Sequence, residues 1–186
     1  MKHQGTQTIE TDRLILRRYT IEDASQMYRN WASDPEVTKF LTWPVHSSEE
    51  VSGRVMQMWI DSYEDPAYYN WGIVWKESGE VIGNIAAVNL NEDLDEAEIG
   101  YCLGRAWWGQ QIMPEALEAV IRFFFDQVEA NRVCAHHDSK NPKSGRVMQK
   151  AGMKLEGVLR AAARNNQGIC DKVCYGILRK EGAEEV

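Results

Sequence analysis

The segment WWGQQIMPEAL, residues 107–117, joins a strand-like stretch to a long helix and decides how the rest of the chain is arranged. Its turn contains Gly109, and Pro114 suits the first turn of a helix, where a missing N–H costs nothing. The first N–H groups of a helix have no partner within it, and the helix dipole places partial positive charge beside them. The segment therefore predicts an anion-binding helix N-terminus, although such junctions also occur without a ligand.

The helix after this turn has the clearest pattern in the chain. Its apolar residues recur at the spacing of one helical face: Leu117, Val120, Ile121, Phe124, Phe125 and Val128. Strands are expected over residues 8–19, 69–75, 81–88, 97–103, 132–137, 155–163 and 171–178, and further helices after Thr20, after Ser47 or Ser48, and from Asn141 to Gly152. Because a crossover helix joins parallel strands, the order β-α-α-β-β-β-α-β-α-β-β predicts an α+β fold with a mixed sheet.

Length and charge restrict the kind of protein. A chain of 186 residues, 44% of them apolar, is long enough to bury a core as one domain. The net charge of −7 argues against a nucleic-acid surface, which needs a basic face, and suits a cationic partner such as an amine or a basic peptide. No apolar run reaches the roughly 18 residues that span a bilayer, and residues 1–6 lead into no signal-peptide core. We expect neither nucleic acid nor membrane as a partner.

The cysteines and histidines do not form a recognisable site. Cys102, Cys134, Cys170 and Cys174 include no CxxC pair and no disulfide-scaffold spacing, so reduced thiols in the cytoplasm are the simplest account. His136 and His137 adjoin Asp138, but neighbours on a strand face opposite ways and further ligands at suitable spacing do not stand out. We expect no metal site and a cytoplasmic location.

Five fragments, in order and at their spacing, carry a family resemblance. They are TDRLILR at residues 11–17, AEIGY at 97–101, Trp108-Gly109 with Glu115-Ala116-Leu117, NPKS at 141–144 followed by KAG at 150–152, and EGVLR at 156–160. Together they resemble the GNAT superfamily of acyl-CoA-dependent N-acetyltransferases and, within it, the RimJ/RimL-type branch of ribosomal-protein N-terminal acetyltransferases. The resemblance implies a single domain over residues 1–186. It also implies a mixed, mostly antiparallel sheet of about seven strands with about four helices, whose central strands splay into an acyl-CoA cleft.

The resemblance further implies acetyl-CoA as cosubstrate, held largely by backbone N–H groups. The implied cofactor-binding residues are Trp108, Gly109, Gln110, Gln111, Ile112 and Met113 in the loop, Tyr101, Cys102 and Leu103 on the strand before it, and Asn141 and Ser144 at the next helix start. The loop departs from the family pattern at Gln111, where a glycine is usual, so the side chain could crowd the phosphates. Met148 replaces a tyrosine that protonates the leaving thiolate in many members, and in this branch Ser144 can take that role. Asn141 could equally be a plain N-cap, and Ser144 a plain first-turn serine.

The implied reaction transfers an acetyl group from acetyl-CoA to a primary amine by direct attack in a ternary complex. The amine arrives as an ammonium and must lose a proton, for which a carboxylate acting through a water is a suitable base. We expect Glu98 to be this base, because it lies on the strand that borders the implied cleft. Alternation places Glu96 on the same face, so Glu96 is a rival, and both could belong to a solvated acidic surface. Cys102 is not expected to act as a nucleophile, since direct transfer needs none.

The identity of the amine is open at this point. The branch resemblance implies the α-amine of a protein N-terminus, while a small molecule such as a polyamine, an amino acid or an antibiotic is the alternative. A weakly catalytic CoA-binding module also remains open, because Gln111 and Met148 depart from the family pattern. Nothing in the sequence decides whether the chain is a monomer or a homodimer.

Overall fold

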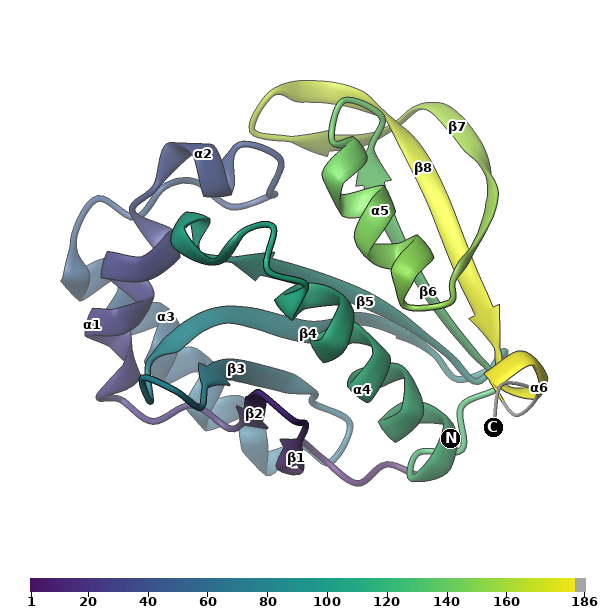
Figure 1. Cartoon of the computed structure of the whole chain (residues 1–186), viewed down its shortest axis with the longest axis horizontal. Coiled ribbons are helices and arrows are strands. Elements are labelled where there is room, and N and C mark those ends of the chain that lie inside the picture. Colours follow the sequence, from purple (N-terminus) through teal and green to yellow (C-terminus); the bar gives the residue numbers. More distant parts are fainter. Residues whose placement is uncertain (183–186) are drawn as a thin grey trace.

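The structure is a computed structural model that describes residues 1–182 (Figure 1). Apolar alternation along the chain produces one sheet of eight strands, in the order β1-β2-β3-β4-β5-β6-β8-β7. The strands are β1 (Ile9–Glu10), β2 (Leu14–Arg17), β3 (Asn70–Trp75), β4 (Val81–Asn91), β5 (Glu96–Leu103), β6 (Arg132–Asp138), β7 (Lys154–Asn165) and β8 (Gly168–Leu178). All neighbours pair antiparallel except β5 and β6, which are parallel because the intervening chain crosses over through a helix. The mixed, mostly antiparallel α+β fold expected from the sequence is confirmed.

Helices cover both faces of this sheet. They are α1 (Asp23–Met27), α2 (Pro35–Thr38), α3 (Glu49–Asp61), α4 (Ile112–Asp126), α5 (Pro142–Lys150) and α6 (Arg179–Gly182), with a π-helical turn at Tyr28–Ala32 and 3₁₀ turns at Ser62–Glu64 and Arg105–Trp107. The described residues thus contain six α-helices where about four were expected, because α2 and α6 are only four residues long. None of these helices is long and apolar enough to cross a membrane.

The strand expected over residues 8–19 is wrong in one respect, because it is two strands joined by a turn. Strands β1 and β2 pair antiparallel, with Ile9 opposite Leu16, and the eighth strand of the sheet arises from this division. The Thr11 hydroxyl accepts the N–H of Leu14 at 3.0 Å and so closes the turn. The turn presents Arg13 toward the start of α4, where the side chain donates to the carbonyl oxygens of Gln110 and Gln111.

The largest cluster of buried side chains lies between α4 and one face of the sheet. The face of α4 predicted from its spacing is buried, and Phe124 is fully inaccessible. Trp71 of β3 meets Phe123 edge to face, with ring centroids 5.5 Å apart. A second cluster on the other face packs Trp31 and Met56 of the α1–α3 region against Cys102 of β5. Burial of side chains this large stabilises by about 1.5–3 kcal/mol each, so both clusters fix β5 rigidly between two helical layers.

The central strands β5 and β6 pair over a short length and then diverge. Their register contains three pairs, of which Glu98 with Cys134 is the last, while β6 remains paired with β8 as far as Asp138. Figure 1 shows the two strands converging near the chain termini and separating toward α2. We call this divergence the fork. It leaves residues 99–103 of β5 without a strand partner on the β6 side.

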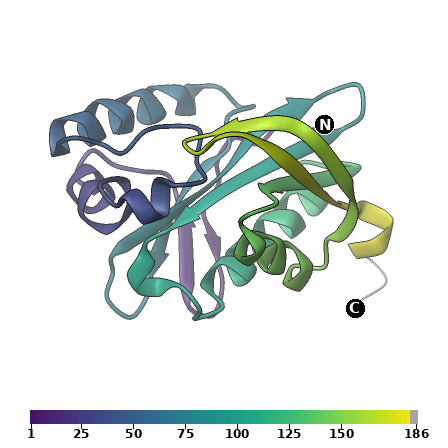
Figure 2. The same ribbon diagram turned by 90° about the horizontal axis from the view of Figure 1, so that it is seen from above.

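The tip of the β7–β8 hairpin closes over the open end of the fork. Asn166 at this tip donates its side-chain amide to the carbonyl oxygens of Thr38 at 2.9 Å and Trp43 at 2.7 Å. Its backbone N–H also donates to Leu41, at 3.0 Å. Figure 2 shows the hairpin arching across the sheet toward the helical segment that contains α1 to α3. We call this connection the Asn166 bridge.

Candidate active site

The loop before α4 presents a row of unbonded N–H groups. Gln111 at its end has φ 61° and ψ 19°, the left-handed conformation that glycine adopts most readily, and Gly109 has φ 80°. None of the backbone N–H groups of residues 109–113 has an acceptor among residues 1–182. Turns of this kind, placed at a helix N-terminus, bind the oxygens of phosphates. We call residues 108–113 the loop.

The Arg13 side chain holds the carbonyl side of this loop. It donates to the carbonyl oxygens of Gln110 at 2.9 Å and Gln111 at 3.1 Å, and its Nε donates to Glu115 at 2.7 Å. The Thr11 hydroxyl donates to the other Glu115 oxygen at 2.6 Å. Burial opposes ionisation of Glu115, but these hydrogen bonds outweigh it and hold the pKa of the carboxyl below its usual value. The acidic residue in the first turn of α4 is thereby neutralised on the side away from the free N–H groups.

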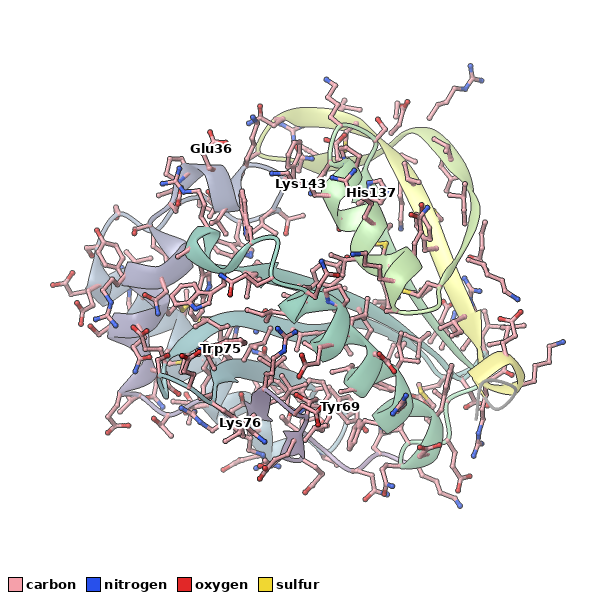
Figure 3. All side chains as sticks on the ribbon, in the orientation of Figure 1. Glu36, Tyr69, Trp75, Lys76, His137 and Lys143 are labelled. Carbon is pink, nitrogen blue, oxygen red and sulfur yellow. The ribbon has the colours of Figure 1, made fainter. Side chains whose placement is uncertain are left out.

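Two lysines of α5 add positive charge beside the loop. The ammonium of Lys143 lies 5.0 Å from the centroid of the Trp108 ring, and Lys150 donates to the side-chain oxygen of Gln111 at 2.5 Å. Figure 3 shows Lys143 at the N-terminal end of α5. In a chain with net charge −7, this local concentration of cations matches a phosphorylated ligand. The Gln111 side chain is drawn toward α5 by Lys150, so the crowding expected from its replacement of glycine is reduced.

Residues 101–103, expected from the resemblance to bind the cofactor, line the β5 arm of the fork. Their backbone on the β6 side has no strand partner, so an extended chain could add there as a further strand. The Cys102 side chain is buried, and burial raises the pKa of its thiol to about 12. A thiol held in this form packs against its neighbours and is a poor nucleophile. Leu103 contributes its carbonyl oxygen, which accepts the indole N–H of Trp108 at 2.8 Å and ties the loop to β5.

Ser144 of α5 forms a hydrogen-bonded pair with Tyr101. The phenol oxygen of Tyr101 lies 3.0 Å from the Ser144 hydroxyl and 3.1 Å from its carbonyl oxygen. Burial raises the pKa of Tyr101, so the phenol keeps its proton. Sequence reasoning assigned only backbone groups of Tyr101 to the site and did not foresee this hydroxyl. Asn141 stands at the N-cap position of α5, but its side chain makes no capping bond and no other bond within residues 1–182.

Met148 is packed in the core beneath this pair and is 1% exposed. A thioether has no proton to donate, so the position where many family members have a tyrosine contributes only packing here. The hydroxyl groups that remain near the fork on this face are those of Tyr101 and Ser144.

Glu98 and His136 meet across the start of the fork on the opposite face of the sheet. Alternation along β5 directs Tyr101 toward α4 and α5 and directs Glu98 to the opposite face. Cys102 shares the face of Glu98, and it packs in the second cluster, on the side of the sheet away from α4. His136 Nδ1 lies 2.5 Å from Glu98 Oε1, and the Lys172 ammonium lies 3.8 Å from the same oxygen. The hydrogen bond from His136, supported by Lys172, outweighs burial and lowers the pKa of Glu98.

The rival carboxylate Glu96 is engaged elsewhere. Arg132 binds it and also forms a two-bond ion pair with Glu156, in which Nη2 lies 2.6 Å from Oε2. This network lies where β5 and β6 are still paired, before the fork opens. Glu98 is therefore the better placed of the two carboxylates that the sequence left as alternatives. His137 faces the other way and is buried against α5, so the two adjacent histidines do not share a site.

The described residues contain no group of three or more His, Cys, Asp and Glu side chains that could hold a metal ion. Cys134, beside Glu98 in the register, has its thiol pKa raised to about 12 by burial and by the nearby Glu96 and Glu98 carboxylates. The groups that remain for chemistry are a carboxylate–imidazole pair on one face of the fork and a hydroxyl pair on the other.

A forked sheet beside a loop of free N–H groups is the arrangement expected of an acyl-CoA-dependent transferase. Residues 13–154 match the family described as acetyltransferase (GNAT) domain, and the chain belongs to that family. It is 30% identical over 177 residues to a protein named uncharacterized N-acetyltransferase p20 from Bacillus licheniformis, which covers 95% of this chain and 99% of the relative. It is 33% identical over 142 residues to the ribosomal-protein-serine acetyltransferase of Escherichia coli K12, which covers 73% of this chain and 75% of that relative.

The fold agrees with this assignment. The structure of RimL, the ribosomal L7/L12 α-N-protein acetyltransferase in complex with coenzyme A, superposes with a TM-score of 0.82 at 21% identity, covering 92% of this chain and 98% of that one. The expected class is confirmed: the chain is an acetyl-CoA-dependent N-acetyltransferase of the GNAT family.

Proposed function

We propose that this chain transfers the acetyl group of acetyl-CoA to the α-amine of a protein N-terminus, by direct attack of the amine in a ternary complex. The observation that carries the proposal is the placement of Glu98 and Ser144 on opposite faces of the fork. A thioester lying between them has a base on the side from which an amine approaches and a proton donor on the side where the thiolate leaves.

Acetyl-CoA fits the groups present. The free N–H groups of residues 109–113, with Lys143 and Lys150 beside them, would hold the pyrophosphate. Gly109 has open space where a Cβ would stand, so a phosphate can approach the backbone there. The unpartnered edge of β5 from residue 99 to residue 103 would bond the pantetheine arm and direct the thioester toward Glu98.

The chemistry then needs three proton transfers, two from the nitrogen and one to the sulfur. The basic group on the Glu98 face of the fork removes a proton from the ammonium, so that the nitrogen lone pair can attack the thioester carbon. Backbone N–H groups on the open edge of β5 would stabilise the oxyanion. When the C–S bond breaks, Ser144 donates a proton to the sulfur and regains one from the attacking nitrogen, which loses its second proton as the amide forms. The Tyr101 phenol lies within hydrogen-bond distance of the Ser144 hydroxyl and holds it in place.

The Asn166 bridge supports an N-terminal α-amine over a lysine on a folded surface. It joins the hairpin to residues 38–43 across the open end of the fork, so an acceptor that approaches from this end would pass beneath it. An extended N-terminus can thread through such an opening, whereas a folded surface cannot. The relatives named ribosomal-protein acetyltransferases support the same class of acceptor.

A small amine is the second candidate, and the same bridge favours it because a polyamine or an amino acid would also pass beneath. The test compares, by mass spectrometry, acetylation of a Ser-Ala-Ala-Trp peptide, the same peptide with a blocked α-amine and one internal lysine, and a polyamine such as spermidine. Acetylation of the first alone would support the proposal. Turnover of spermidine alone would replace it with the second candidate, and binding of acetyl-CoA without turnover of any amine would indicate the CoA-binding module.

A further inference from the structure

Two basic side chains meet at the start of the fork, on the face of the sheet away from α4 and α5. His136 on the β6 arm and Glu98 on the β5 arm are joined across the fork by a 2.5 Å contact between Nδ1 and Oε1. A carboxylate accepts and does not donate, so this contact fixes the tautomer with the proton on Nδ1. Nε2 then carries the lone pair, and it has no partner among residues 1–182.

Glu98 itself is poorly prepared to take a proton from the amine. One of its oxygens faces both His136 and the Lys172 ammonium, which lies 3.8 Å away, and its side chain is only 17% exposed. Both contacts stabilise the ionised carboxylate and so weaken it as a base. The His136 ring is 35% exposed on the same face and is therefore the more accessible of the two basic groups.

We propose that His136 accepts the amine proton at Nε2 and that Glu98 is a positioning residue that holds the ring and stabilises its charged form. This inference rests on the proposed function and names the atom through which its base acts. A carboxylate bound to one ring nitrogen raises the basicity of the other, which is the arrangement that histidine bases use in catalysis.

The proposed step balances without any further reactant. The ammonium N–H bond breaks and leaves its electron pair on nitrogen, while the proton bonds to Nε2 and gives an imidazolium paired with Glu98. The nitrogen lone pair forms the new bond to the thioester carbon, and the C–S electrons depart to sulfur, which takes its proton from Ser144. The second proton on the attacking nitrogen leaves as the amide forms and returns the Ser144 oxygen to its neutral hydroxyl. The imidazolium then releases its proton to solvent, so the net products are the amide, CoA thiol and one proton.

The surroundings of the ring contain no competing base in contact with it. The other titratable groups on this face of β5, β6 and β8 are, by the strand register, Glu96, Arg132, Cys134, Asp138, Cys170, Lys172 and Cys174. Glu96 and Arg132 bind each other. Cys134 is held as a thiol, Lys172 is a cation, and the Asp138 carboxylate accepts the N–H of Lys140 and the amide of Asn165. Cys174 lies opposite His136 in the register and directs its thiol toward the Lys172 carbonyl oxygen.

The first test is rescue of a His136→Ala variant by free imidazole, with the Ser-Ala-Ala-Trp peptide as acceptor and release of CoA thiol as readout. We expect kcat to fall about 10²-fold or more and KM for acetyl-CoA to stay within about twofold. Added imidazole should restore part of the lost rate, and more basic methylimidazoles should restore more. The matched control is Glu96→Gln, a carboxylate of the same strand face that Arg132 engages, and its kcat should stay at the wild-type value.

The second test separates the two partners. Glu98→Gln should lower kcat less than His136→Ala does, and the double variant should be no worse than His136→Ala alone, because both act through one proton acceptor. Nitrogen NMR of the ring should show the Nδ1–H tautomer in the wild type and its loss in Glu98→Gln.

Two results would overturn the inference while leaving the proposed function intact. One is a His136→Ala variant with wild-type kcat, and the other is a Glu98→Gln variant that is the more damaged of the two and that imidazole does not rescue. Either would return the base role to Glu98 acting directly. If the wild type acetylates no amine at all, the proposed function itself fails, and this inference fails with it.

Discussion

Arg13 and Glu115 lie 102 residues apart in the chain and form an ion pair in which Nη2 is 2.6 Å from Oε2. The same guanidinium donates to two carbonyl oxygens of the loop. A loop whose carbonyl groups are fixed on one side must present its N–H groups on the other. The ion pair therefore orients the free N–H groups of the loop.

The first prediction is that Arg13→Met weakens acetyl-CoA binding by roughly tenfold, which corresponds to about 1.4 kcal/mol. The methionine retains the length of the side chain but leaves the carbonyl oxygens of Gln110 and Gln111 without their donor. Isothermal titration measures the change. Lys76→Met is the matched control, since Lys76 binds the same turn through Thr11 but does not reach the loop. Equal affinity in Arg13→Met and the wild type would show that the loop holds its shape unaided.

Glu115 also makes the free energy of unfolding depend on pH. Its pKa is lower in the folded chain than the roughly 4.3 of a free glutamate, so the unfolded chain takes up the proton first as the pH falls. The contribution of Glu115 is therefore complete above about pH 4.3 and is lost as the pH falls below that value. Urea unfolding at a series of pH values should show a shallower acid slope in Arg13→Met than in the wild type. Parallel slopes would mean that the Arg13 contact does not lower the pKa of Glu115.

The third prediction concerns Gln111, whose φ of 61° is the conformation that the usual glycine would adopt. Because the backbone already has this shape, Gln111→Gly should leave the acetyl-CoA dissociation constant within about threefold. Gln111→Val should weaken binding about tenfold, since a left-handed conformation costs about 1–2 kcal/mol and a β-branched side chain tolerates it worst. Isothermal titration of both variants decides the matter. A large gain in affinity for Gln111→Gly would show that the glutamine side chain does obstruct the phosphates.

The parts of this site that sequence could predict are those set by local pattern. Residues 107–117 predict a turn and a helix from a glycine and a proline at suitable positions. The alternation of residues 97–103 places Glu98 and Tyr101 on opposite faces of the strand. The features of the site that the sequence does not predict depend on contacts between distant segments. Residues 8–19 alternate in a way that conceals the turn at Thr11, and nothing local connects Arg13 to a loop 97 residues later.

His136 illustrates the same limit. Its strand was predicted, and alternation correctly separates it from His137, yet its partner could be found only from the β5–β6 register. That register depends on the packing of α4, which sets how the two parallel strands align. A search for carboxylates on the same face of a predicted parallel neighbour would have found Glu98 as a candidate.

The fourth prediction tests the proton donors on the α5 face. Ser144→Ala should lower kcat about 10²-fold, and Tyr101→Phe about tenfold, because the phenylalanine keeps the ring but removes the hydroxyl that supports the serine. KM for acetyl-CoA should hardly change in either variant. Release of CoA thiol measures both constants, and Ser78→Ala in the exposed turn between β3 and β4 is the control. A wild-type kcat in Ser144→Ala would show that Ser144 is not the proton donor to the leaving thiolate.

The last prediction concerns the Asn166 bridge. Asn166→Ala removes two side-chain hydrogen bonds to residues 38 and 43, and each such bond contributes about 0.5–1.5 kcal/mol, so the free energy of unfolding should fall by about 1–3 kcal/mol. The backbone N–H of Asn166 should also exchange faster with deuterium, since its bond to Leu41 depends on the tip staying docked.

Gln167→Ala is the matched control, because this side chain belongs to the same turn and makes no hydrogen bond within residues 1–182. If the bridge restricts which acceptors enter, Asn166→Ala should change KM for the peptide more than KM for acetyl-CoA, since the bridge bonds to residues 38–43 and not to the loop that we propose for CoA. Unchanged exchange at the hairpin tip would show that the two sides of the fork are held together by packing alone, and the argument for a threaded N-terminus would lose its structural basis.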